Sequence, residues 1–174
     1  TATLTSQGDY DAFVCMLDAD GDFVWARSFG GTARDSAAFG ARDASGAIYV
    51  TGAFRGTADF DPGPDSFTMS SAGNADAYVL KLDADGDFVW ARRFGGLADD
   101  FGWGVGLGPD GNIYSAGAFA GAATIGPIPN SFIAAGAGGV DSFIVSYDPE
   151  GNPEGAMWFG GTGDDRVERM HVTA

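Results

Sequence analysis

Aspartates at alternate positions occur in two short segments of this chain, and their spacing is typical of metal-ion chemistry. The six residues are Asp18, Asp20, Asp22, Asp83, Asp85 and Asp87. A third segment has Asp148, Glu150 and Asn152 at the same spacing. Three oxygen side chains at positions i, i+2 and i+4 around a glycine resemble the start of a loop that binds a hard cation. We therefore take the six aspartates as candidate ligands for Ca²⁺, the only cofactor that the sequence indicates.

A hairpin turn accounts for the same residues and is the favoured interpretation. Gly21 and Gly86 stand one position away from the glycine of the helix–loop–helix calcium motif, and no bidentate glutamate follows at the required distance. In a turn, the aspartate bonds its own backbone, and the glycine takes a left-handed conformation before the strand resumes. If calcium binds, backbone carbonyls or a neighbouring segment must supply the remaining ligands.

Other acidic residues form one set that recurs along the chain and one that does not. Asp59, Asp61 and Asp65 have no acidic counterparts later in the sequence, which favours a solvated loop. Three further aspartates each stand four residues after a Gly-Gly pair: Asp35, Asp100 and Asp165. Because a catalytic residue is expected once rather than in every copy, we predict that these carboxylates accept hydrogen bonds from loop N–H groups.

The sequence contains no recognisable catalytic constellation. Arg34, Arg55 and Trp103 are the candidates that do not recur, and Trp103 could stack on a sugar if it lined a pocket, although filling space is its favoured role. His171 is the only histidine, which argues against a transition-metal site. A Gly-x-Ser-x-Gly elbow and a phosphate-binding loop are both absent. We therefore expect no catalytic residue within this segment.

Charge and composition limit the class of partner. The chain has 24 acidic against 9 basic residues and a net charge of −15, a field that repels nucleic acid and anionic lipid headgroups. Apolar residues make up 45% of the chain, which is enough for a hydrophobic core. No apolar run reaches the roughly 18 residues of a membrane-spanning helix. We expect a protein or glycan partner, or further copies of the chain, and neither nucleic-acid binding nor membrane insertion.

One phrase occurs three times in the chain. The copies are "DAFVCMLDADGDFVWARSFGG" from Asp11, "DAYVLKLDADGDFVWARRFGG" from Asp76 and "DSFIVSYDPEGNPEGAMWFGG" from Asp141, so the period is 65 residues. Apolar residues alternate with others at the start of each copy, which predicts a half-buried strand. Cys15 aligns with Leu80 and Val145, so we expect a small core hydrophobe there. No disulfide can form within the chain because this cysteine has no partner.

Each repeat contains four segments that are typical of strands. Hairpin turns such as "DADG" and "DASG" separate them, one segment is crowded with Ala and Gly, and a Pro/Gly-rich loop (121–131 in the second copy) precedes the last strand. We therefore predict an all-β fold of β-propeller blades, each of four antiparallel strands, with about 2.7 repeats of 65 residues and the small-residue strand innermost. A β-solenoid is the alternative, but its coils are shorter.

The repeat resembles the bacterial SBBP repeat family of seven-bladed β-propellers. The resemblance is carried by Asp11–Val14, Leu17–Gly21, Gly30–Gly31 with Asp35, Asp43–Val50 and Thr51–Gly52. The second copy matches at nearly every position, and the third only in part. The resemblance implies a propeller in a large exported or cell-surface protein, and it implies no defined reaction.

On this basis we divide the chain into a partial blade (1–31), two blades (32–96 and 97–161) and the first strand of a further blade (162–174). The chain opens in the middle of a repeat without a methionine, so an excerpt of a longer chain is favoured. Closure of a ring by three copies is the alternative, but it would omit one interior strand at each junction.

The expected function is that of a non-enzymatic, secreted or cell-surface bacterial propeller that serves as an interaction or structural module. Two alternatives stay open. One is a calcium-stabilised adhesin that uses the six turn aspartates. The other is a polysaccharide-processing propeller enzyme whose catalytic residues lie outside this segment.

Overall fold

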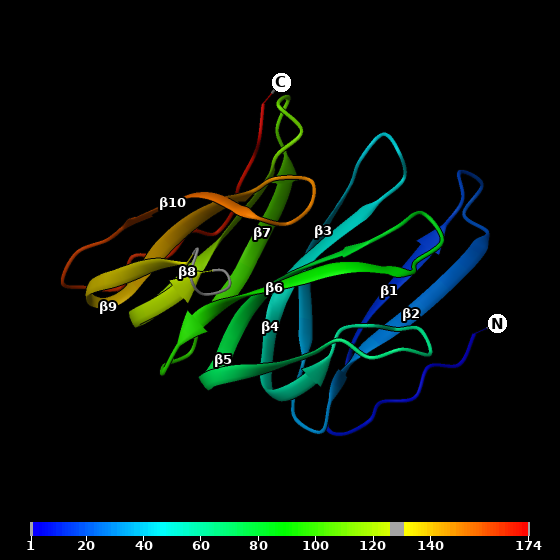
Figure 1. Cartoon of the computed structure of the whole chain (residues 1–174), viewed down its shortest axis with the longest axis horizontal. Coiled ribbons are helices and arrows are strands. Elements are labelled where there is room, and N and C mark those ends of the chain that lie inside the picture. The colour runs from blue at the N-terminus through cyan, green and yellow to red at the C-terminus, as the bar shows by residue number, and fades with distance from the viewer. Residues whose placement is uncertain (1, 126–130, 174) are drawn as a thin grey trace.

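The computed structural model describes residues 2–125 and 131–173, which form an all-β protein without a helix (Figure 1). The strands are β1 (Ala12–Leu17), β2 (Phe23–Gly31), β3 (Ser36–Arg42), β4 (Ile48–Asp59), β5 (Thr68–Leu82), β6 (Phe88–Gly96), β7 (Phe101–Leu107), β8 (Ile113–Ile125), β9 (Phe132–Tyr147) and β10 (Pro153–Phe159). None of the described residues belongs to a helix that is long and apolar enough to cross a membrane. Much of the predicted Pro/Gly-rich loop at 121–131 lies outside the described residues.

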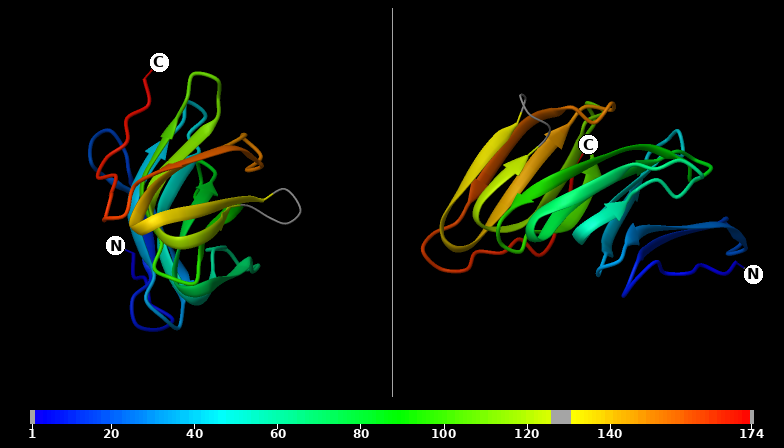
Figure 2. Two further views of the ribbon diagram at one scale, coloured as in Figure 1. Left: turned by 90° about the vertical axis from the view of Figure 1, so that its left-hand side faces the viewer. Right: turned by 60° about the horizontal axis from the view of Figure 1, so that its bottom comes forward.

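All ten strands belong to one antiparallel sheet that does not close on itself. Hydrogen-bonded neighbours follow the order β1-β2-β4-β5-β6-β8-β9-β10, while β3 pairs only with β4 and β7 only with β8. We call β1–β2 the first hairpin, β3–β6 the middle unit and β7–β10 the C-terminal unit. Figure 2 shows these three groups of strands one after another along the molecule. Strands β6 and β7 begin 65 residues after β2 and β3.

Five tight turns build the hairpins within these groups. In each turn a glycine N–H donates to the carbonyl three residues earlier, and the glycine φ lies between 80° and 95°. The glycines are Gly21, Gly46, Gly86, Gly111 and Gly151. Glycine adopts this left-handed conformation without the steric cost that a Cβ would add. The turn interpretation of the "DADG" and "DASG" segments is confirmed.

Successive groups are joined by very short ladders at the Gly-Gly pairs. Gly30 and Gly31 of β2 pair with Asp59 and Ala58 of β4, and β6 pairs with β8 through Phe94, Gly95 and Gly96. The crossing is close, because a Cβ on Gly31 would overlap the Thr57 carbonyl oxygen. The recurring Gly-Gly pairs therefore mark the places where one group of strands passes to the next.

Two hydrophobic cores lie between the three groups. One core joins the first hairpin to the middle unit, with Trp25 and Phe29 packed against Tyr78 and Leu80. The other joins the middle unit to the C-terminal unit, with Trp90 and Phe94 among its buried residues together with Phe119, Ile125, Phe143 and Tyr147. Burial of several large aromatic side chains in each core is the main stabilising contribution, at about 25 cal/mol per Å² of apolar surface.

The burial of the repeated strand differs from the sequence prediction. Half-burial was expected for every copy, but Tyr78 and Leu80 of β5 face the first core while Ala77 and Val79 face the second. β1 and β9 each show a single buried face, as expected, but in β1 Cys15 is exposed rather than a core residue. The reason is that β5 lies between two packed groups, whereas no described residue covers the outer face of β1.

The strand expected over 162–174 is not formed over 162–173, and residue 174 lies outside the described residues. We call residues 162–173 the C-terminal tail. Strands β3 and β7 each pair with the strand that follows them, whereas the tail pairs with no strand among the described residues. The start of the tail is nevertheless held in the same way as the residues just before β3 and β7. The Asp165 N–H donates to the Val140 carbonyl at 2.6 Å, and the N–H groups of Asp35 and Asp100 donate to the Tyr10 and Ala75 carbonyls. Its position is thus set, although its ladder is missing.

Candidate functional site

The candidate calcium ligands lie in the hairpin turns, where the first aspartate of each set is used by the backbone. Asp18 Oδ1 accepts the N–H groups of Asp20 and Asp22 at 3.0 and 2.9 Å. Asp83 Oδ1 accepts those of Asp85 and Asp87 at 2.9 Å each. The structure therefore brings each set together around a capped turn. Among the described residues, no group of three or more His, Cys, Asp or Glu side chains has a metal-binding arrangement.

The carbonyls of the second turn are occupied by the neighbouring strand group. Trp25 Nε1 donates to the Ala84 carbonyl at 3.2 Å, and the Arg27 guanidinium donates to the Asp85 carbonyl at 3.0 Å. The same guanidinium lies 3.5 Å from the Asp87 carboxylate. The neighbour thus supplies hydrogen-bond donors to this turn, where a calcium site would need further oxygen ligands.

The same Trp and Arg contacts recur at the turn of residues 148–152, but the first turn has no such contacts with the described residues. Trp90 Nε1 donates to the Pro149 carbonyl at 3.0 Å, and the Arg92 guanidinium donates to Glu150 and Gly151. At the turn of residues 18–22, by contrast, no described residue lies close enough to touch a side chain placed on Gly21. The turns of residues 83–87 and 148–152 are thus docking points for a Trp and an Arg of the preceding group, and Trp25 and Trp90 act as packing residues.

A second family of aspartates holds the loops that carry the Gly-Gly pairs. Asp35 accepts the N–H groups of Gly31 and Arg55, and Asp100 accepts those of Gly96 and Ala120. In the tail, Asp165 accepts the N–H of Gly161 at 2.7 Å. The prediction that these recurring carboxylates accept loop N–H groups is confirmed.

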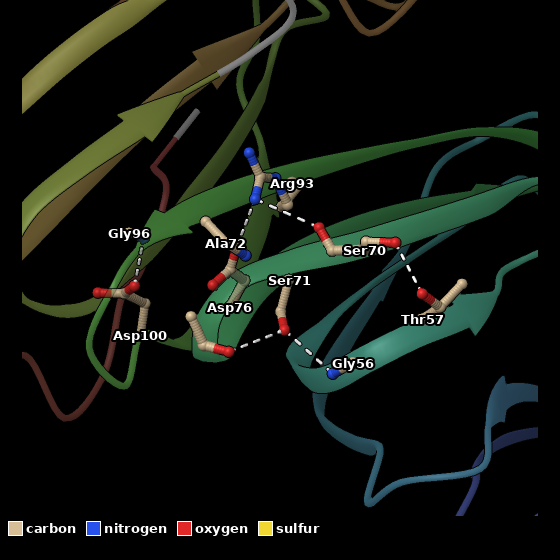
Figure 3. Close-up of polar contacts among 10 residues, drawn as sticks. Gly56, Thr57, Ser70, Ser71, Ala72, Asp76, Arg93, Gly96 and Asp100 are labelled. Atoms are coloured by element: carbon tan, nitrogen blue, oxygen red, sulfur yellow. Dashed lines mark hydrogen bonds and ion pairs between the residues drawn. The ribbon is translucent and has the colours of Figure 1, made fainter.

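Sequence reasoning missed a third family, the aspartates that open each repeat: Asp76 and Asp141, which are buried, and Asp11, which is half-buried. Each accepts a backbone N–H from four residues earlier, at 2.8 to 3.0 Å. Only Asp76 also binds a guanidinium, that of Arg93 at 2.8 Å (Figure 3). Their signal in the sequence was a charged residue that recurs at the start of a strand that becomes buried.

Burial dominates the electrostatics of these carboxylates. It raises the pKa of Asp100 to about 7, against the opposing effect of the N–H groups of Gly96 and Ala120, and the nearby charges of Asp76 and Asp99 act in the same direction as burial. Burial also raises the pKa of Asp35 and of Asp76, the latter against the attraction of Arg93. Their bonds to recurring backbone groups mark these acids as structural.

The residues that depart from the repeat meet in one pocket. A cavity of about 410 Å³ is lined by Arg34, Arg55 and Trp103, together with small residues of β4 and β7. A second cavity, of about 750 Å³, shares Ser36, Ala38 and Trp103 and continues to the C-terminal tail. The three candidates that the sequence singled out as unrepeated are therefore neighbours, although 69 positions separate Arg34 from Trp103.

Neighbouring side chains hold the two arginines and the tryptophan of this pocket in place. Arg55 pairs with Asp99 at 2.9 Å, and the same carboxylate oxygen accepts the Ala75 N–H at 3.2 Å. The Arg34 guanidinium lies 5.3 Å from the centre of the Tyr10 ring. Trp103 stacks on Phe101 with ring centres 5.6 Å apart, and 40% of its surface stays exposed. Guanidinium donors beside an open aromatic surface can bind a ligand, and they supply neither nucleophile nor general base.

The other sequence candidates lie apart from this pocket. In the Asp59 loop, Asp59 Oδ1 accepts the N–H groups of Asp61 and Phe67, and Asp61 Oδ1 accepts that of Gly63. This agrees with the predicted loop. His171 is exposed in the C-terminal tail. No functional residue was predicted in the tail, yet Glu168, Arg169 and Met170 line the larger cavity.

Comparison with known proteins gives one distant similarity. No known protein-family model matches the chain. The chain is 27% identical over 146 residues to the Regulatory protein FlaEY of Caulobacter vibrioides, an alignment that covers 84% of this chain and 15% of that protein. The chain thus spans a small part of the length of the relative that it matches.

Proposed function

We propose that the chain is a segment of a secreted or cell-surface bacterial β-propeller, of the kind found in SBBP repeats, and that it acts as a non-enzymatic interaction or structural module. The middle and C-terminal units each serve as one four-stranded blade. Strands β3 and β7 lie side by side as inner strands, and the tail continues the series, since Met170 and Val172 pack against Gly104 and Gly106 of β7.

The observation that carries the proposal is the contrast between equivalent positions in the middle and at the start of the sheet. Phe13 is 62% exposed, whereas its equivalent Tyr78 is 1% exposed. Leu17 is likewise exposed and Leu82 buried. Apolar residues on an open face indicate an interaction surface.

The occupant that fits this face is a further four-stranded unit of the same repeat. In the middle of the molecule, β4 pairs with one edge of β5, and the Trp25 and Arg27 side chains reach the turn beyond it. Further strands of the same repeat would offer the first hairpin the same two elements. A strand equivalent to β4 would complete its own unit at the edge of β1, and the unit before that would place a Trp–Arg pair on the turn of residues 18–22. These strands belong to the same polypeptide or to another copy.

The similarity to a protein named as regulatory agrees with a role exercised through binding. An interaction module needs no catalytic residues of its own, and the pocket of Arg34, Arg55 and Trp103 is equipped for binding alone. The polysaccharide-processing alternative requires catalytic groups outside this segment. In that case the pocket of Arg34, Arg55 and Trp103 would contribute only to substrate binding.

The calcium-stabilised adhesin is a second candidate that rests on Asp20 and Asp85. Their carboxylates are exposed and make no hydrogen bond with the described residues, so they are available to a cation. If calcium stabilises the turns, a chelator lowers the melting temperature, and the double change Asp20→Ala with Asp85→Ala removes the difference. Equal melting with and without chelator rules this candidate out.

Two measurements test the main proposal. The intact mass under denaturing conditions shows whether the polypeptide is 17.8 kDa or several tens of kDa, and so whether the covering unit is another copy or part of the same chain. Amide hydrogen exchange then compares residues 12–17 with residues 77–82 in the native protein. We expect equal protection, because a covering unit would pair with β1 as β4 pairs with β5.

For a 17.8-kDa chain, light scattering should show an assembly that Phe13→Ser with Leu17→Ser dissociates. Val89→Ser is the matched control, because Val89 is exposed on β6 in the middle of the sheet. A stable monomer at high concentration with fast exchange in β1 would overturn the proposal.

A further inference from the structure

We propose that the pocket of Arg34, Arg55 and Trp103 binds an acidic sugar, that is, a sugar ring that carries a carboxylate. The inference goes beyond the interaction module proposed above, because it concerns a site inside one chain and does not depend on what covers the first hairpin. The pocket volume of about 410 Å³ lies in the range of small-ligand sites.

The charge of the pocket is opposite to that of the molecule. The chain has only 9 basic residues and a net charge of −15, yet two of its arginines line one cavity. Arg34 makes no ion pair with any described residue, and Arg55 is held in the wall by Asp99 at 2.9 Å. A guanidinium binds a carboxylate through two parallel N–H donors, so this local excess of donors selects an anionic group.

The shape of the pocket favours a ring beside that anionic group. Trp103 lines the cavity with part of its surface open, and its position is fixed by stacking on Phe101. The floor is made of small residues, Gly52, Ala53, Ala75 and Gly102, which leave room next to the indole. A pyranose ring has a flat face of C–H groups that covers an indole, and a uronic acid carries its carboxylate on the same ring.

An acidic peptide fits these features less well. An Asp or Glu side chain could reach the arginines but has no flat face to place on Trp103. The larger cavity beyond Trp103 adds Glu168 and Arg169 from the C-terminal tail. A second sugar of a longer chain would enter there. Because Glu168 and Arg169 carry opposite charges, this cavity adds no net preference for a second anionic group, so we expect an acidic unit followed by a neutral one.

The repeat provides variants that remove the site while keeping the fold. Trp103 aligns with Ala38, Arg55 with Ala120, and Arg34 with Asp99. Trp103→Ala, Arg55→Ala and Arg34→Asp therefore install residues that the chain itself carries at equivalent positions. The fold does not need these three residues. The middle unit forms its four strands with Ala38 in place of Trp103, and the C-terminal unit forms its own with Asp99 and Ala120 in place of the two arginines.

The experiment titrates the native protein with a disaccharide of one uronic acid and one neutral sugar, with the corresponding neutral disaccharide, and with a Glu-containing dipeptide. Binding is followed by calorimetry, and unchanged melting temperatures verify the fold of each variant. We expect the acidic disaccharide to bind at least about tenfold more tightly than the neutral one, because one charge-assisted pair contributes that much. Arg34→Asp and Trp103→Ala should each weaken binding about tenfold, whereas Arg166→Ala, an arginine outside both cavities, should not.

Three outcomes would overturn the inference. Equal affinity for the neutral disaccharide removes the role of the carboxylate. Equal or tighter binding of the dipeptide with the same dependence on Arg34 assigns the pocket to peptides. No binding of the acidic disaccharide at millimolar concentration removes the site altogether, and it leaves the exchange protection of the first hairpin, and so the proposed module, unaffected.

Discussion

Strands β1 and β5 carry nearly the same sequence and have opposite surroundings. β1 contains Phe13, Cys15 and Leu17 on an exposed face, whereas the equivalent residues of β5 are fully buried. β4 pairs with one edge of β5, and each face of β5 packs in one of the two hydrophobic cores. The comparison teaches that burial in this architecture is a property of the neighbouring units. Each unit completes its core only on the next one.

The turns show the same contrast at their glycines. A Cβ on Gly86 would lie 3.1 Å from the Trp25 ring, and one on Gly151 would lie 2.7 Å from the Trp90 ring. A Cβ on Gly21 would meet nothing within 4 Å. The turns of Gly21 and Gly86 thus have the same sequence but differ in whether a Trp side chain packs against them.

The largest expected difference concerns the buried faces of β1 and β5. Leu80→Ala should lower the free energy of unfolding by about 3 kcal/mol, because it leaves a cavity in the core of Trp25 and Tyr78. Where no further unit covers β1, Cys15→Ala at the equivalent position should cost less than about 0.5 kcal/mol, since the side chain is then exposed. Urea unfolding of the two variants measures both values. Similar losses would mean that β1 is covered in solution.

The turn glycines should give a smaller difference. Gly21→Ala and Gly86→Ala both force alanine into a positive φ, at a cost of about 1 kcal/mol each. Gly86→Ala should cost about 1–2 kcal/mol more, because its methyl group displaces the Trp25 ring. Thermal unfolding with Trp fluorescence detects the loss. If the two variants melt together, either Trp25 is not docked on the turn of Gly86 or a further unit covers the turn of Gly21 in solution.

The buried carboxylates Asp35, Asp76 and Asp100 should make stability depend on pH. The pKa of Asp100 is about 7 in the folded protein, above its ordinary value of 3.8. The folded state therefore binds the extra proton, and its stabilising contribution is complete below pH 3.8 and lost as pH rises through 7. We expect the free energy of unfolding to increase by about 1 kcal/mol from pH 8 to pH 6.

Asp100→Asn should flatten this pH profile, measured by urea unfolding at several pH values. The raised pKa values of Asp35 and Asp76 act in the same direction and keep part of the slope. Asp43, Asp110 and Asp148 have lowered pKa values, so their contribution is lost only in acid, below this window. Asp22→Asn, in the open first turn, is the control. An unchanged slope in Asp100→Asn would contradict the assignment.

The turn aspartates should show no difference between the two regions. Asp18→Ala and Asp83→Ala each remove an acceptor for two turn N–H groups, at a cost of about 1 kcal/mol. Because these contacts stay within the turn, the cost should be equal at the start and in the middle of the sheet. Urea midpoints that differ strongly would show that the neighbour contributes to the cap.

Local features of this fold could be predicted from the sequence, and features that depend on a neighbour could not. The turns at Asp18 and Asp83 and the loop bonds of Asp35 follow from residues within a short stretch. The exposure of Cys15 and the missing strand after residue 161 depend on which units lie next to them. The repeat alone does not contain that information.

The candidate site divides in the same way. Arg34, Arg55 and Trp103 could be singled out because they break the repeat. That they line one pocket follows from the side-by-side placement of β3 and β7, which are not hydrogen-bonded to each other. The tail residues Glu168 and Met170 gave no signal, because their place in the larger cavity depends on contacts with β7.

The short ladders at the Gly-Gly pairs have a mechanical consequence. Only two residue pairs join β2 to β4, and three join β6 to β8, whereas β4 and β5 are paired along most of their length. A pulling force applied to the two ends of the sheet meets few backbone hydrogen bonds at these seams. Under load, the groups of strands should therefore separate as intact blocks at Gly31 and Gly96 before any hairpin unravels, so the sheet should yield in steps.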